Sequence, residues 1–270
     1  MQVDERTFRK MIKAKARVTL FRRPGFALLA GLYTFLPMML FALVLQLIAQ
    51  AEWGVGLRLA ALGAAALAYL LVLSPLTMGK IRYLCLCCRG QGVAPLGELF
   101  AYSSGWKGYV RALQMTALTE GMTVLWSLLF FLPGGCYLYY IITLPVVTEE
   151  QLYLSLFLLV CGWIMVCIQR QTYLASMILV AGNHNIRPMT ALRTARTLYR
   201  GQYPLKCRFY TSFLGWVVLS LATGGIATIV YDLYYTTSLI LLTDSLCANA
   251  LIRAKAQQTG QGQENGRKGE

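Results

Sequence analysis

The sequence of 270 residues is poor in charged side chains and has a single histidine. Charged residues make up 13% of the chain and hydrophobic residues 57%, with a mean hydropathy of +0.55. A water-soluble domain of this length needs more charge to cover its surface. The composition therefore excludes a soluble globular protein, and it also excludes disordered, collagen-like and disulfide-rich secreted classes.

Common catalytic signatures are also absent from the sequence. We find no P-loop, no GxGxxG motif that opens a helix, no HExxH motif and no GxSxG motif. Cys85, Cys87 and Cys88 lie together, but one C-x-x-C pair without a second is weak evidence for a metal, and acylation is an alternative. We therefore expect no enzyme activity, no metal and no cofactor.

What the chain does contain is long apolar stretches. A helix needs about 20 apolar residues to cross the ~30 Å hydrocarbon core of a bilayer. The sequence predicts an all-α, polytopic transmembrane bundle of about six spans within 26–251. These spans are 26–49, 59–79, 112–132, 152–182, 211–231 and 233–251.

The distribution of the cations predicts the orientation of this bundle. The formal net charge is +14, and all Lys and Arg except Arg58 and Arg170 lie before the first span, between spans two and three, between spans four and five, or in the tail. Lys and Arg prefer the cytoplasmic side of a membrane. We therefore expect a multi-pass membrane protein with both termini in the cytoplasm and Asp232 in an outer loop, and no nucleic-acid partner.

Two basic segments have the periodicity of amphipathic helices on the cytoplasmic face. In 1–25 the predicted apolar stripe is Met11, Ala14, Val18 and Phe21, and the cations opposite it are Arg9, Lys10, Lys13 and Arg17. In the second segment Thr190 caps the predicted helix, whose stripe is Met189, Leu192, Ala195 and Tyr199 beside Arg193, Arg196 and Arg200. We expect these cations to bind anionic headgroups of the inner leaflet.

Two further segments are predicted not to form spans. The region 134–151 contains a Pro-Gly-Gly turn at its start and three tyrosines, which favours an interfacial or re-entrant segment. The alternative is a separate short crossing, with a break between two half-spans at Arg170. The polar segment 252–270 is predicted to be a disordered cytoplasmic tail.

Three charged residues lie within the predicted spans: Glu120, Arg170 and Asp244. Glu120 is about 12 Å into its span at ~1.5 Å per residue, which places it near the midplane. A lone charge at that depth costs about 2.5 to 3.5 kcal/mol or more. One hypothesis is a polar path for a solute or an ion, and the favoured alternative is an ion pair or protonated acid that orients helices.

Several short motifs follow one another in a specific order: 76–83 (LTMGKIRY), 99–100 (LF), 132–134 (LPG), 191–201 (ALRTARTLYRG) and 213–223 (FLGWVVLSLAT). In this order the chain resembles an uncharacterised bacterial family of multi-pass membrane proteins, domain of unknown function 975. That family is distantly similar to the membrane domain of certain glycerophosphodiesterases. The resemblance implies a membrane fold and a location in the bacterial cell membrane, but no activity.

Taken together, these patterns lead us to expect a structural or regulatory membrane component. Its expected partners are the lipid bilayer, anionic headgroups of the inner leaflet, and another membrane protein or a second copy of the chain. The alternative function is a small-solute or ion transporter or channel that uses Glu120, Asp244 and Arg170.

Overall fold

The computed structural model describes residues 5–22, 24–90, 94–143, 148–183 and 186–267, with side chains as far as Ile252. Within these residues the chain is helical and has no strand, which confirms the predicted all-α class. Five helices are long and apolar enough to cross a membrane, so this is a membrane protein. They are α2 (Pro24–Gln50), α3 (Val55–Cys88), α4 (Trp106–Ile142), α5 (Glu149–Gly182) and the first part of α9 (Ala227–Arg267).

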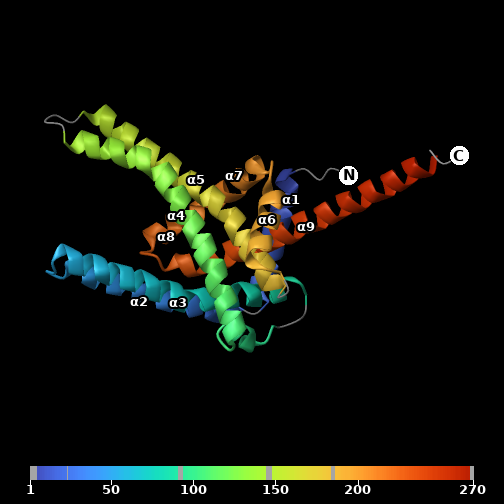
Figure 1. The fold of residues 1–270 in the computed structure, drawn as a ribbon, viewed down its shortest axis with the longest axis horizontal. Helices are drawn as coiled ribbons and strands as arrows, with labels where there is room; N and C mark the ends of the chain where they lie inside the picture. The colour runs from blue at the N-terminus through green and yellow to red at the C-terminus, as the bar shows by residue number, and fades with distance from the viewer. Residues whose placement is uncertain (1–4, 23, 91–93, 144–147, 184–185, 268–270) are drawn as a thin grey trace.

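Figure 1 shows two antiparallel hairpins, α2–α3 and α4–α5, whose closed ends both lie at the left of the view, opposite the C-terminus. We call these ends, where α2 and α4 finish and α3 and α5 begin, the tips. At the other end of the hairpins, which we call the base, lie α1 (Glu5–Phe21), η1 (Leu96–Phe100), α6 (Pro188–Tyr199) and α7 (Tyr203–Thr211). The short helix α8 (Leu214–Ala222) lies between the two hairpins.

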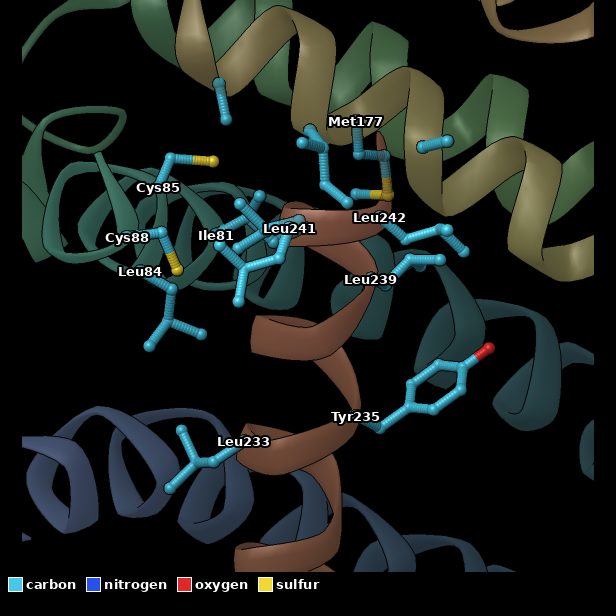
Figure 2. Packing of buried hydrophobic residues seen from close by; sticks show 14 of the residues in the cluster. Ile81, Leu84, Cys85, Cys88, Met177, Leu233, Tyr235, Leu239, Leu241 and Leu242 are labelled. Carbon is cyan, nitrogen blue, oxygen red and sulfur yellow. The ribbon is translucent and has the colours of Figure 1, made fainter. Parts of the chain in front are cut away.

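The hydrophobic core lies in the base, around the middle of α9. Every residue of 233–243 in α9 is buried. Figure 2 shows Leu233, Leu239 and Leu242 projecting from α9 toward neighbouring helices, with Ile81 of α3 and Met177 of α5 in the same cluster. The base is therefore a packed helical bundle, whereas the hairpins expose many large apolar side chains, as lipid-facing helices do.

The α4–α5 hairpin differs from the sequence prediction. Helix α4 continues through Pro133 and Gly134 to Ile142, so an interfacial or re-entrant segment in this part of 134–151 is wrong; 144–147 lie outside the described residues. The two helices approach closely, because a Cβ at Gly162 would lie 2.8 Å from a backbone oxygen of α4. Helix α5 is continuous across Arg170, so the alternative of a break between two half-spans there is also wrong.

Two predictions for the C-terminal part of the chain are wrong as well. The segment 211–231 is not one spanning helix, because α8 ends at Ala222 and α9 begins at Ala227. The glycines between them, Gly224 and Gly225, have φ of 60° and 93°, a conformation that interrupts a helix. The predicted disordered tail is instead a continuation of α9 as far as Arg267.

The basic amphipathic helices are present, but one presents a different face from the predicted one. In α1 the buried residues are Ile12 and Ala16, whereas Met11, Val18 and Phe21 of the predicted stripe are exposed. In α6 the predicted stripe is buried except for its first residue, which is exposed. Helix α6 begins with a proline at its first position after Arg187, so the predicted cap at Thr190 is wrong.

Candidate functional site: paired charges and basic clefts

The predicted charge cluster is divided between two places in the fold. Arg170 Nη2 lies 3.5 Å from Glu120 Oε1, so these two residues form an ion pair between α5 and α4. Their side chains are 51% and 38% exposed, respectively. Asp244 is paired elsewhere, with Arg89, so the described contacts do not join the three residues into one path.

The greater length of α4 changes the place of Glu120 along its helix. Since α4 continues to Ile142, its uncharged part runs from 121 to 142, about 33 Å at ~1.5 Å per residue. The uncharged part of α5, from 151 to 169, is about 28 Å long by the same rise. The Glu120–Arg170 pair therefore lies at the base end of two membrane-length stretches and not halfway along them.

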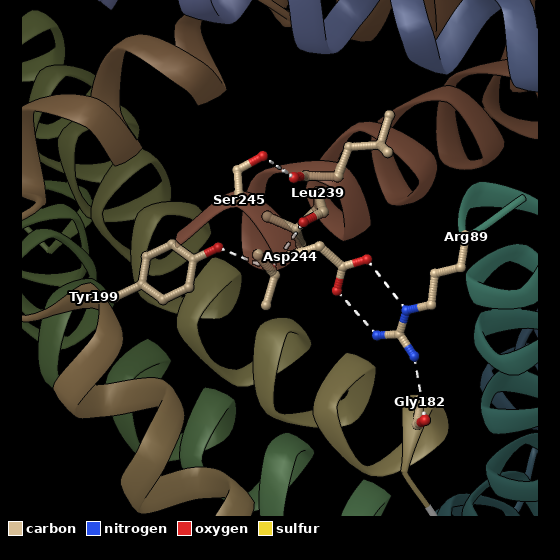
Figure 3. Close-up of polar contacts among 8 residues, drawn as sticks. Arg89, Gly182, Tyr199, Leu239, Asp244 and Ser245 are labelled. Atoms are coloured by element: carbon tan, nitrogen blue, oxygen red, sulfur yellow. Dashed lines mark hydrogen bonds and ion pairs between the residues drawn. The ribbon is translucent and has the colours of Figure 1, made fainter. Parts of the chain in front are cut away.

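Arg89 connects three helices at the base. Its Nη2 and Nε donate to the two carboxylate oxygens of Asp244 at 2.9 and 3.2 Å, and its Nη1 donates to the Gly182 carbonyl oxygen at 3.1 Å. Figure 3 shows the guanidinium between the carboxylate of α9 and the end of α5. This two-point contact with a carboxylate holds the base ends of α3, α5 and α9 together.

Two more ion pairs connect elements of the base. Lys80 Nζ of α3 lies 2.6 Å from Asp232 Oδ2 of α9 and donates to Thr34 Oγ1 at 3.3 Å. Arg82, two residues further along α3, pairs with Glu98 of η1. Each of the acidic residues Glu98, Asp232 and Asp244 is thus matched by a cation at the base end of α3.

Lys206 of α7 is a buried lysine with a different kind of partner. The residue is 2% exposed, and its ammonium donates to Thr172 Oγ1 at 3.1 Å and lies 4.3 Å from the Tyr203 ring centre. Burial lowers the pKa of Lys206. Its neighbour across the helix interface, Gln171, donates to the Lys206 carbonyl oxygen at 3.2 Å. These contacts fix α7 against α5.

Helix α1 directs cations toward the bundle. Lys13 donates to the Ser212 carbonyl oxygen at 2.9 Å, and its ammonium lies 4.2 Å from the Phe213 ring centre. Arg9 donates to a carbonyl oxygen of α7, and Arg17 donates to a tyrosine hydroxyl of α9. Burial, followed by repulsion from Arg17 and Arg9, lowers the pKa of Lys13 to about 8. These cations therefore attach α1 to the base.

The remaining predicted lipid-facing cations are on the surface. Lys10 is exposed on α1, and Arg193, Arg196 and Arg200 are exposed on the outer side of α6. Arg196 makes only a weak contact, at 3.7 Å, with a methionine sulfur of α4. Their contact with anionic headgroups stays a prediction.

Sequence reasoning missed a cleft of about 850 Å³ where the start of α4 lies beside the start of α6. Three of the residues that line it are the cations Lys107, Arg111 and Arg187, and none of the lining residues is acidic. Trp106, which is 78% exposed, forms part of the wall, and the apolar lining includes Met189 and three residues of α4. The sequence does show Trp106 followed by the cations Lys107 and Arg111. It does not show that the start of α6 packs beside them, because that is a tertiary contact.

A second cleft, of about 540 Å³, lies between α1, the start of α2 and the end of α3. Its cations are Lys15, Arg22 and Arg89, and its lining also includes apolar residues of all three helices. Of these cations, Arg89 forms an ion pair with Asp244. Among the described residues no cluster of His, Cys, Asp and Glu could hold a metal ion.

Comparisons with protein-family models, with curated proteins and with solved structures find no match to this chain. The resemblance to the bacterial multi-pass family therefore stays a prediction from the sequence.

Proposed function

We propose that this chain is a non-catalytic structural or regulatory component of a bacterial cell membrane, with its base and both termini on the cytoplasmic side. We further propose that the base binds an anionic phospholipid of the inner leaflet in the cleft between α4 and α6. The observation that carries this proposal is a cleft with three cations, no acidic lining residue, an exposed tryptophan and apolar walls.

The chemistry of the cleft matches a lipid better than a free anion. Lys107, Arg111 and Arg187 supply donors for a phosphate, and arginine forks match phosphate geometry. Trp106 is amphipathic and suits the headgroup level of a bilayer. The apolar lining favours the glycerol and first acyl carbons, which inorganic phosphate lacks. The site therefore matches a molecule with an anionic head and an apolar body.

Transport receives no specific support from the described contacts. Glu120 and Arg170 neutralise each other, and Asp244 is held by two hydrogen bonds from Arg89. A carboxylate that binds and releases a proton during transport must be able to become neutral. A cation within contact distance favours its charged form, and each of these acids has one. We therefore give priority to the structural or regulatory function.

Native mass spectrometry of the purified protein with phosphatidylglycerol or phosphatidylcholine tests the proposal. Each cation near an anionic headgroup contributes about 1 kcal/mol, or about fivefold in affinity. We expect the Lys107→Gln, Arg111→Gln, Arg187→Gln triple variant to bind phosphatidylglycerol about a hundredfold more weakly, with unchanged binding of phosphatidylcholine.

The matched control removes three cations from α6 by Arg193→Gln, Arg196→Gln and Arg200→Gln, since these residues are exposed outside the cleft. We expect this variant to retain most of the affinity for phosphatidylglycerol. An equal loss in both triple variants, or equal binding of the two lipids by the unmodified protein, contradicts a specific site in the cleft.

A further inference from the structure

The apolar segment between α7 and the buried part of α9 begins and ends at the same level of the molecule. Phe213, just before α8, has its ring centre 6.4 Å from that of Tyr231 and 5.3 Å from that of Tyr234, both on α9. The residues 214–230 therefore leave the base and return to it. Figure 1 shows α8 between the two hairpins, on the side toward which their tips point.

The direction of α9 after this segment follows from two ion pairs with α3. Lys80 pairs with Asp232, and Arg89 pairs with Asp244. Along α3 the chain runs from the tip toward the base, and Lys80 comes at the end of the uncharged stretch 59–79, about 30 Å long. Because α9 follows the same direction past the same two points, its residues after Asp232 run further away from the tips.

The turn between α8 and α9 supplies acceptors for its own backbone N–H groups. The Gly225 N–H donates to the Ser220 carbonyl at 2.7 Å and the Gly224 N–H to the Leu221 carbonyl at 3.2 Å, which is the Schellman pattern. The Ala227 N–H donates to Thr223 Oγ1 at 3.1 Å. Each backbone N–H from 223 to 229 has an acceptor within the segment. An unsatisfied backbone group in hydrocarbon costs several kcal/mol, so these hydrogen bonds favour a turn that lies within the bilayer.

The side chains of this segment differ sharply from those of the following part of α9. The segment exposes five large apolar residues, whereas every residue of 233–243 is buried. The most exposed is Leu221, at 78%, one residue before the end of α8. The exposed residues are Val218, Leu219, Leu221, Ile226 and Val230.

We propose that 214–230 is a re-entrant hairpin, which enters the membrane from the base side, turns at Gly224–Gly225 and leaves on the same side. Its surface partner is the acyl-chain layer of one leaflet. From Phe213 to the turn the chain can reach about 16 Å at ~1.5 Å per residue, about half of the ~30 Å hydrocarbon core. It follows that α2, α3, α4 and α5 cross the membrane and α9 does not, although part of α9 is long and apolar enough.

The buried part of α9 agrees with this assignment. Of the five candidate helices, α9 has the lowest mean hydropathy in its apolar stretch. It also has the largest buried share of that stretch. Its hydroxyl side chains at 236, 237, 238 and 243 face the interior of the base bundle. The inference is independent of the proposed lipid site, because it uses no residue of the cleft between α4 and α6.

Site-resolved labelling with a membrane-impermeant maleimide tests the hairpin, applied from each side of sealed vesicles and read by peptide mass spectrometry. Native cysteines stay in place because each site is read separately. Glu150→Cys marks the tip side, Ala222→Cys reports the turn, and Ala248→Cys reports α9 beyond its buried part. All three positions are exposed in the structure.

We expect Ala222→Cys not to react from either side of the sealed vesicles and to react fully after unfolding in SDS. We expect Ala248→Cys to react only from the side opposite to Glu150→Cys. Labelling of Ala222→Cys from either side, or of Ala248→Cys from the same side as Glu150→Cys, overturns the proposal. If Ala222→Cys lowers the amount of folded protein, Leu221→Cys replaces it, because that side chain is exposed and apolar.

Discussion

Removing one partner of the Lys80–Asp232 pair is expected to have an effect that depends strongly on which partner is removed. The Lys80 side chain is 8% exposed and the Asp232 side chain 40% exposed. Asp232→Ala leaves a buried ammonium whose remaining contact is Thr34 Oγ1 at 3.3 Å. Breaking a buried pair in this way costs about 3 to 5 kcal/mol of folding free energy.

Lys80→Met is expected to cost much less. Methionine keeps the packing of the lysine stem, and the carboxylate left behind is accessible enough to be hydrated, so the loss is about 1 kcal/mol. In the double variant neither charge is left alone, and its cost should fall below the sum of the single costs by about 0.5 to 3 kcal/mol.

Thermal unfolding in detergent micelles, followed by tryptophan fluorescence, measures these differences. Equal destabilisation by the two single substitutions would refute the burial argument for Lys80. Additive effects in the double variant would refute the contact itself, and with it the alignment of α9 along α3 on which the re-entrant hairpin depends.

Two further predictions concern the packing of α3 and the protonation of α1. A Cβ at Gly79 would lie 1.9 Å from the Leu99 carbonyl oxygen, so Gly79→Ala should lower the free energy of unfolding by about 1 to 3 kcal/mol; Gly63→Ala, on the same helix with open space, should raise it by about 0.5 to 1 kcal/mol in the same assay. Because the pKa of Lys13 is lowered from 10.5 to about 8, the unfolded chain holds a proton there that the folded chain releases, and stability should rise with pH between about 8 and 10.5. Thermal melts across this range should show the rise in the unmodified protein and in Lys10→Met but not in Lys13→Met, and an unchanged pH slope in Lys13→Met would contradict it.

The hydropathy of the sequence was enough to predict the all-α class and the helices that contain the first two apolar stretches. It was not enough for α4, because a Pro-Gly-Gly sequence usually ends a helix in water. Here the close approach of α5 at Gly162 and the apolar surroundings of a membrane helix keep the backbone helical through Pro133. The prediction of an interfacial segment was wrong because it used local propensity alone and did not include the packing of the neighbouring helix.

The faces of α1 illustrate a second limit. Its sequence allows two apolar stripes at helical spacing, one with Met11 and Val18 and one with Ile12 and Ala16. The structure buries the second, because that face lets Lys13 reach the Ser212 carbonyl. Periodicity predicts that a helix has a buried side, but the choice between two similar sides depends on its neighbours.

The same limit explains why Glu120 and Arg170 could be singled out from the sequence while the partner of Asp244 could not. Charged residues within apolar stretches are conspicuous, and two of them pair with each other. Arg89 lies after the end of its apolar stretch and looked like one more cation of a basic loop. Its role depends on α9 running beside α3, and that placement depends on whether 211–231 crosses the membrane.

That segment could have been interpreted differently from the sequence, because Gly224–Gly225 divides it and Asp232 follows at once. The mean hydropathy of the whole stretch hides both features, because it does not depend on how far each half of the stretch can extend into the membrane. Two apolar arms of about 10 residues each reach about 15 Å, which is half a bilayer. A carboxylate at the end of the second arm is stable if a cation meets it, and Lys80 lies where α3 leaves its own apolar stretch.

A re-entrant hairpin also keeps an even number of crossings, so the basic segments stay on one side just as six spans would place them. The charge distribution therefore cannot distinguish the two topologies, whereas the position of Asp232 relative to Lys80 can.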